Sequence, residues 1–150
     1  FQELINTMQQ NKIIIVIFED FNIREVAVHY AAVLAQRINA HIIFLLLMEY
    51  ELNSKDEPGP LKQKYKDIIL KRIHGIIGNN IPVQAEVMLG DRRSEFYKFM
   101  AYNKLFHTVV WGGDEKAPID KTGRSASHWM ARIKDELSCP LVIPKKKYKL

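Results

Sequence analysis

The chain has 150 residues, of which 47% are hydrophobic and 26% charged, and its formal net charge is +5 at pH 7. This length is typical of one α/β domain, and the composition is that of a globular protein with an adequate core. The longest apolar run, 42–48, is shorter than the roughly 20 residues that span a bilayer, so we expect no membrane insertion. The chain begins with Phe1 and has no secretory signal pattern, and we therefore expect a cytoplasmic segment excised from a longer protein.

Cys139 is the single cysteine, which excludes an internal disulfide and suits a reducing cytoplasm. The five histidines show no metal-ligand spacing, so the sequence predicts no metal site. Much of the positive charge lies in the basic run 145–149, which we interpret as a solvated end without a nucleic-acid partner. We divide the chain into a helical lead-in (1–10), one domain (11–146) and a basic tail (147–150).

The first half of the domain alternates strands and helices. The β-branched and aromatic run 13–18 and the apolar run 41–48 are typical of strands buried on both faces. Between them, apolar residues at helical spacing predict a helix with Asn22 as its N-cap. Its predicted buried stripe contains Ile23, Val26, Ala27, Tyr30, Ala31, Leu34 and Ile38.

The second half continues this alternation. A lysine-rich amphipathic helix is predicted to end at Gly78, and residues 81–89 alternate apolar and polar side chains, as in a strand near a sheet edge. Ser94 is the predicted cap of the next helix, and 107–111 is the predicted fourth strand. The last helix is predicted to carry Trp129, Met130, Ile133 and Leu137 on one face, before a short fifth strand over 141–143.

This βαβαβαβαβ pattern predicts a single open five-stranded parallel sheet with helices on both faces. The fully apolar strands one and two are expected at its centre and the two-faced strand three at an edge. Ligands of such sheets bind at the carboxyl ends of the strands, where the winding reverses. If strands one and four are neighbours, Asp20 and Gly112-Gly113 face the same crevice.

Over 11–146 the chain resembles the universal stress protein family. The signs are Glu19-Asp20-Phe21 after strand one, Gly90-Asp91 before a helix, a glycine after strand four, and Cys139-Pro140 leading into the last strand. The resemblance implies strand order 3-2-1-4-5 in a Rossmann-like sheet of the adenine nucleotide alpha hydrolase type. It also implies ATP or another adenine nucleotide, with Mg²⁺ if bound, as the ligand. Finally, it implies a homodimer paired through Leu141, Val142 and Ile143.

The glycine motif of the ATP-binding members is incomplete here. That motif is Gly, two residues, Gly, nine residues, and then Gly followed by Ser or Thr. Starting from Gly112, its second glycine falls on Glu115 and its third on Ser125, and no other register completes it. A Glu115 carboxylate opposes a phosphate, whereas Lys116, Lys121 and Arg124 partly offset it. We therefore predict a weak, altered or lost nucleotide site.

The resemblance places an adenine or ribose contact at Asp20, although an Asp there also caps a turn. Gly112-Gly113 either cradles a ligand or serves a tight strand exit that needs positive φ, and Ser125 and Ser127 are alternatively helix N-caps. Arg92 is expected in a solvated turn. The full set of candidate nucleotide-binding residues is Phe18, Glu19, Asp20, Ile42, Gly90, Gly112, Gly113, Gly123, Arg124, Ser125 and Ser127.

Enzyme signatures such as a P-loop or a nucleophile elbow are absent from the sequence, so we predict no catalytic residues, with slow ATPase activity left open. The favoured interpretation is a non-catalytic regulatory, stress-response domain that dimerises. Two alternatives stay open: an adenine-nucleotide sensor, and a cytoplasmic regulatory domain of a membrane transporter.

Overall fold

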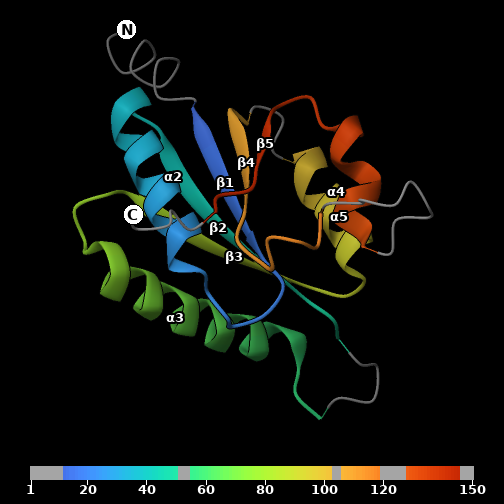
Figure 1. The fold of residues 1–150 in the computed structure, drawn as a ribbon. Coiled ribbons are helices and arrows are strands. Elements are labelled where there is room, and N and C mark those ends of the chain that lie inside the picture. Colours follow the sequence, from blue (N-terminus) through green and yellow to red (C-terminus); the bar gives the residue numbers. More distant parts are fainter. Residues whose placement is uncertain (1–11, 51–54, 103–105, 119–127, 146–150) are drawn as a thin grey trace, which may run out of the picture.

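The structure, a computed structural model, describes residues 12–50, 55–102, 106–118 and 128–145. Five parallel strands form one sheet in the order β3-β2-β1-β4-β5 (Figure 1), which confirms the predicted fold class and strand order. The predicted lead-in helix and basic tail lie outside the described residues. The strands are β1 (Ile13–Phe18), β2 (His41–Met48), β3 (Val83–Leu89), β4 (Thr108–Trp111) and β5 (Leu141–Val142).

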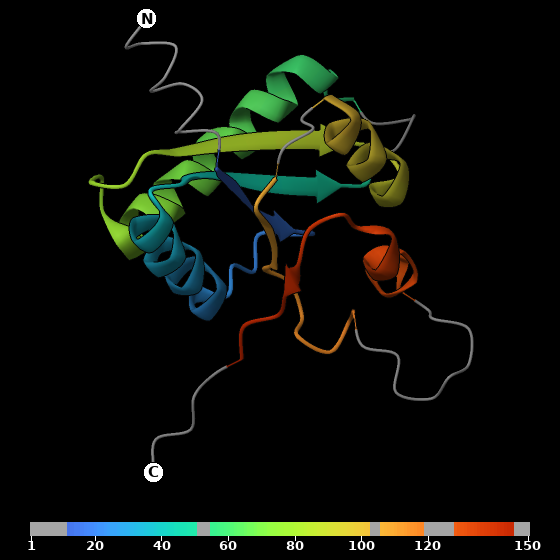
Figure 2. The ribbon, with the colours of Figure 1, turned by 90° about the horizontal axis from the view of Figure 1, so that it is seen from above.

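Helices cover both faces of the sheet (Figure 2). One face packs against α2 and α3, and the other packs against α4 and α5. The helices are α2 (Glu25–Ile38), α3 (Pro58–Ile77), α4 (Arg92–Tyr102) and α5 (Trp129–Ile133), the last continued by the 3-10 turn η1 (Lys134–Glu136). None of the described helices is long and apolar enough to cross a membrane.

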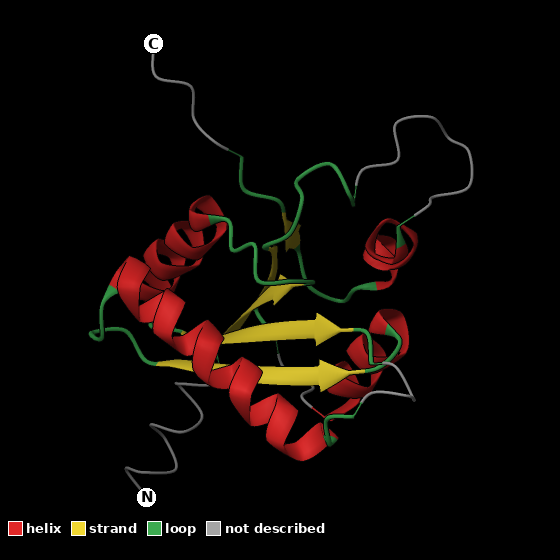
Figure 3. Ribbon diagram, turned by 90° about the horizontal axis from the view of Figure 1, so that it is seen from below, coloured by secondary structure: helices red, strands yellow, loops and turns green. Residues whose placement is uncertain are grey.

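The alternation of side chains along the strands creates two cores. In β1, Ile14 and Val16 face the α2–α3 side, whereas Ile15 and Ile17 face the α4–α5 side, and all four are fully buried. Because every strand is parallel, all carboxyl ends meet at one edge of the sheet (Figure 3). The edge strand β3 is half-buried, as its alternating sequence predicted.

The starts of α2 and α4 differ from the sequence prediction. The N-cap of α2 is Arg24 rather than Asn22, whose backbone N–H instead donates to Asp20. At the start of α4, Asp91 accepts hydrogen bonds from the backbone N–H and the hydroxyl of Ser94, so Asp91 and not Ser94 is the cap. The cap of α2 therefore lies later in the chain than predicted, and the cap of α4 lies earlier.

The buried face of α2 also differs from the predicted stripe. Ala27, Ala31 and Leu34 pack towards the core, but Tyr30 is 38% exposed and Val28 is fully buried. The helix is therefore rotated so that its small residues meet the sheet. This rotation leaves apolar side chains of α2 on the surface.

Candidate functional site

The candidate site is at the carboxyl ends of β1 and β4, where the sequence predicts a crevice; the two strands are direct neighbours in the sheet. Gly112 follows β4, and its backbone N–H donates to the Ile17 carbonyl at 2.8 Å. A Cβ at this position would lie 2.4 Å from the Phe18 ring and 2.8 Å from the Ile17 oxygen. A side chain at Gly112 is therefore excluded by close approach of the two strands.

This explanation corrects the predicted reason for the two glycines. Among the described residues, positive φ occurs at Asn39, Gly78 and Gly90, and not at Gly112 or Gly113. At Gly113 a Cβ would lie 3.0 Å from the Trp111 ring, so packing also restricts that position. The strand exit is tight because of neighbouring side chains and not because of its backbone dihedrals.

Two predicted site residues are core residues. Phe18 is fully buried and stacks on Phe44, with ring centroids 6.1 Å apart and planes within 6°. Ile42 is the second residue of β2 and pairs with Ile14, so it lies near the amino ends of the strands. The prediction that Ile42 lines the crevice is wrong, because the ligand edge of a parallel sheet is the opposite one.

Arg24 connects the loop after β4 to the chain after β5. Its guanidinium donates to the Gly113 carbonyl at 2.7 Å and also to the Pro144 carbonyl. The same guanidinium forms an ion pair with the Glu115 carboxylate at 3.4 Å. The Arg24 side chain is 17% exposed and that of Glu115 39%. We call Arg24, Gly113, Glu115 and Pro144 the Arg24 cluster.

In the described part of the loop after β4 (112–118), three amides are occupied by the protein itself. Gly112 N–H donates to β1, and Lys116 N–H donates to the Asp114 carboxylate at 3.0 Å. Ala117 N–H donates to the Asp114 carbonyl, which also accepts from the Trp111 indole at 2.6 Å. A phosphate-binding loop must direct amides at its ligand, and these three are directed at the chain.

A second group of polar side chains surrounds Glu19, directly after β1. Its carboxylate accepts from His128 Nε2 at 2.7 Å and from Trp129 Nε1 at 2.9 Å. Arg92 Nε lies 3.4 Å from the same carboxylate. We call Glu19, Arg92, His128 and Trp129 the Glu19 cluster. Burial raises the pKa of Glu19, but the hydrogen bonds from His128 and Trp129 and the charge of Arg92 bring it below its ordinary value.

The sequence analysis placed Arg92 in a solvated turn, but the structure does not. It donates to the carbonyls of Leu47 and Glu19, each at 3.1 Å, and forms an ion pair with Glu49 at 3.4 Å. It therefore holds together the carboxyl ends of β1 and β2. The signal for this role is its position immediately after the Gly90-Asp91 turn, where β3 delivers the chain to the same edge of the sheet.

His128 is the N-cap of α5. Its Nδ1 accepts from the Met130 backbone N–H at 3.0 Å, while its Nε2 donates to Glu19. Both ring nitrogens thus have partners in the neutral Nε2–H tautomer that this network implies. The cap role predicted for Ser125 or Ser127 belongs to His128. Those two serines, Gly123 and Arg124 lie outside the described residues.

The remaining candidates have local roles. Asp20 is exposed and accepts from the Asn22 backbone N–H at 2.9 Å, which is the turn-capping alternative of the sequence analysis. Gly90 has φ 144° and donates to the Met48 carbonyl, so a turn requires this glycine. Within the described ranges, no group of three or more His, Cys, Asp or Glu residues could hold a metal ion.

Solved structures with this fold were found by structural comparison. Universal stress protein UspA from Lactobacillus plantarum is 14% identical with a TM-score of 0.60, covering 91% of this chain and 99% of that one. A universal stress protein in complex with cAMP is 13% identical (TM-score 0.63; 91% and 98% covered). A universal stress protein family member from Arabidopsis thaliana with AMP bound is 12% identical (TM-score 0.52; 91% and 92% covered).

No protein-family model matches the chain, and no curated protein matches it by sequence. At these low identities the structural likeness concerns the fold. The chain has the universal stress protein fold over nearly the whole length of these structures, as the sequence resemblance predicted.

Proposed function

We propose that the protein is a universal-stress-type regulatory domain whose adenine-nucleotide site is altered and weak. The observation that carries this proposal is the Arg24–Glu115 ion pair across Gly113. Structures with the same fold have been solved in complex with cAMP and with AMP bound, which makes an adenine nucleotide the ligand class to consider. In this chain the Glu115 carboxylate is already paired with the Arg24 guanidinium, the cation that a phosphate would contact.

The charges at the crevice support weak rather than tight binding. A phosphate within about 4 Å of the Glu115 carboxylate is opposed by up to about 4 kcal/mol at an effective dielectric near 20. Since the Glu115 side chain is 39% exposed, solvent screening reduces this to about 1–2 kcal/mol. Micromolar affinity corresponds to about 8 kcal/mol, so this penalty changes the dissociation constant by about tenfold.

Calorimetric titration with ATP and Mg²⁺, and separately with AMP, tests the proposal. We expect a dissociation constant of about 10 μM or weaker for the wild type and about tenfold tighter binding for Glu115→Gln. Glu57→Gln is the matched control, because Glu57 is an exposed carboxylate before α3. Low-micromolar wild-type binding that Glu115→Gln leaves unchanged would contradict an altered site.

We infer that the domain is non-catalytic. In the part of the crevice that the structure describes, the His128–Glu19 pair supports this inference. One imidazole nitrogen caps α5 by accepting from Met130, and the other donates to Glu19. A general base needs a nitrogen directed at its substrate. Phosphate release from ATP at the rate of a buffer blank is the expected result, and turnover that Glu19→Gln abolishes would contradict it.

We also propose that β5 pairs with β5 of a second copy. Leu141 and Val142 are half-buried in a two-residue strand at the end of the sheet, and such an edge invites pairing. Val142→Lys would place like charges across a two-fold axis, whereas Tyr102→Lys changes a side chain that is 86% exposed. Light scattering should give a dimer for the wild type and Tyr102→Lys, and a monomer for Val142→Lys. A monomeric wild type would refute the pairing.

A further inference from the structure

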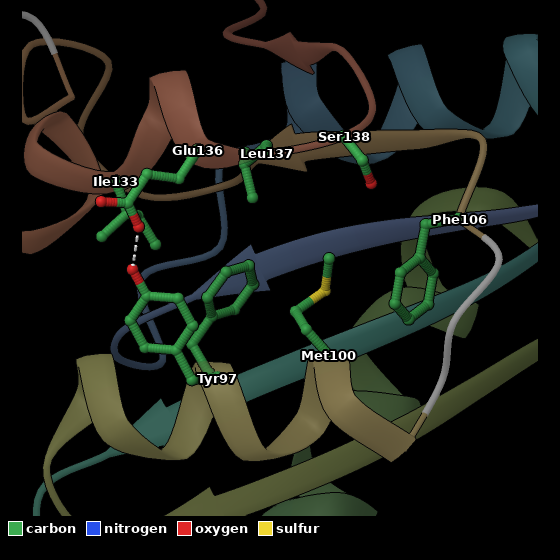
Figure 4. Close-up of a pocket in the computed structure, with 8 residues that line it drawn as sticks. Tyr97, Met100, Phe106, Ile133, Glu136, Leu137 and Ser138 are labelled. Atoms are coloured by element: carbon green, nitrogen blue, oxygen red, sulfur yellow. Dashed lines mark hydrogen bonds between the residues drawn. The ribbon is translucent and has the colours of Figure 1, made fainter.

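A cavity of about 270 Å³ lies between α4 and the α5–η1 segment, on the face of the sheet away from α2 and α3. Figure 4 shows Tyr97 and Met100 of α4 directed across the gap towards Ile133 and Leu137. Phe106 lies at one end of the cavity. The walls are therefore aromatic and aliphatic, with one methionine, whose flexible side chain adapts to different occupants.

The rim of the cavity is polar at both ends. At one end the Tyr97 hydroxyl donates to the Glu136 carboxylate, drawn as a dashed line in Figure 4. At the other end Ser138 lies near Phe106. The hydrogen bond to Glu136 raises the pKa of Tyr97, so the phenol keeps its proton.

The volume limits the occupant to one ring with a short chain. An apolar cavity of about 150 Å³ holds benzene, and sites for drug-sized ligands start at about 300 Å³. At about 270 Å³ this cavity has room for a phenyl ring and two or three further atoms. A nucleotide is too large for it.

The charge at the rim selects the polar group of the occupant. Glu136 is the acidic residue among those that line the cavity, and a carboxylate attracts an ammonium group. The Arg93 guanidinium lies over the Tyr97 ring, 5.8 Å from its centroid, so this ring face already has a cation. The Glu136 carboxylate is then the group that would anchor an ammonium. We propose that this cavity binds a small primary amine that carries one aromatic ring.

The site is separate from the nucleotide crevice but has a physical connection to it. Phe96 lines the cavity and packs against Trp129, with ring centroids 5.4 Å apart. Trp129 in turn donates to Glu19. An occupant that shifts Phe96 therefore changes the surroundings of an indole, and tryptophan fluorescence is a direct readout.

The test is a fluorescence and NMR titration with 2-phenylethylamine as the probe. Two matched probes replace its cation: 2-phenylethanol, which is neutral, and phenylacetate, which is an anion. Glu136→Gln removes the carboxylate at the rim. Asp135→Asn is the control variant, because Asp135 is the adjacent exposed acid and does not line the cavity.

We expect the amine to bind at least about tenfold more tightly than the alcohol, and phenylacetate not to bind at all. Glu136→Gln should weaken amine binding about tenfold, the factor for loss of a charge-assisted hydrogen bond, with Asp135→Asn within about twofold of wild type. Amide shifts should centre on α4 and η1. Equal affinity for amine and alcohol, equal effects of the two variants, or no binding at about 5 mM amine would each overturn the proposal. Adding AMP tests independence: amine binding should persist whether or not the nucleotide binds.

Discussion

Replacing Gly112 by alanine tests whether the glycine after β4 is needed for packing or for binding a ligand. The added Cβ would lie 2.4 Å from Phe18 Cε1 and 2.8 Å from the Ile17 carbonyl oxygen. Real Cβ atoms do not approach other atoms so closely, so one of the two neighbours must move. Neither moves cheaply, because Phe18 is fully buried against Phe44 and Ile17 belongs to the central strand.

The expected cost has two parts. Overpacking a buried site costs about 1–3 kcal/mol, and weakening the Gly112 to Ile17 hydrogen bond adds about 1 kcal/mol. We therefore expect Gly112→Ala to lower the free energy of unfolding by about 3 kcal/mol. For a chain of this size, that corresponds to a fall in Tm of about 6–12 °C.

The assay is urea and thermal denaturation in nucleotide-free buffer, with Gly75→Ala as the matched control. A Cβ at Gly75, in the interior of α3, would meet nothing within 4 Å. That substitution should stabilise the protein by about 0.5–1 kcal/mol, because alanine favours the helix. If Gly112→Ala unfolds within about 0.5 kcal/mol of wild type, the close-approach argument is wrong and the glycine serves a ligand instead.

Three further predictions concern the Glu19 cluster and the single thiol. Arg92→Ala should cost about 1–3 kcal/mol in urea denaturation, because it uncouples the ends of β1 and β2, whereas the exposed Arg93→Ala should cost under about 0.5 kcal/mol. The folded pKa of Glu19 lies below its unfolded value of 4.5, so its contribution to stability is full above pH 4.5 and is lost as the pH falls through the folded value. Denaturation between pH 3 and 7 should therefore show a shallower acid loss for Glu19→Gln, and parallel curves would contradict this assignment. Burial raises the pKa of the Cys139 thiol, so the folded protein should react with a disulfide reagent at pH 8 about tenfold more slowly than the urea-unfolded chain, and equal rates would contradict that burial.

The sequence was sufficient to predict the sheet. Continuous apolar runs identify β1 and β2 as central strands, and the alternation over β3 identifies an edge. A strand buried on both faces needs apolar residues at every position, whereas a strand with one solvated face needs them at every second position. Strand order followed from this and from the family resemblance. Helix caps were less predictable, since Arg24 makes no side-chain cap hydrogen bond and His128 caps α5 through an imidazole nitrogen rather than a hydroxyl or carboxylate.

The site could be predicted only in outline. The position of Gly112 beside β1 follows from topology, but the reason for the glycine depends on where the Phe18 ring packs. Arg92 and His128 were missed because their partners, Glu19 and Leu47, lie in other segments of the chain. The position of Arg92 after the Gly90-Asp91 turn does not by itself identify those partners. Ile42 was misplaced because a strand assignment alone does not say which end of it meets the crevice.

Glu115 was interpreted from the sequence as a negative charge that opposes phosphate. The structure adds that this carboxylate is 3.4 Å from the Arg24 guanidinium, which also donates to Gly113 and Pro144. The Arg24 cluster therefore joins three segments at the crevice. Its two charges should act on a nucleotide in opposite directions.

The most direct test of the altered site is calorimetric titration of AMP into the wild type, Glu115→Gln, and the double variant Arg24→Gln with Glu115→Gln. If Glu115 keeps Arg24 from contacting the phosphate, Glu115→Gln should bind AMP about tenfold more tightly than the wild type. The double variant, which also lacks Arg24, should lose that gain. Low-micromolar binding of AMP that is the same in all three proteins would contradict this account.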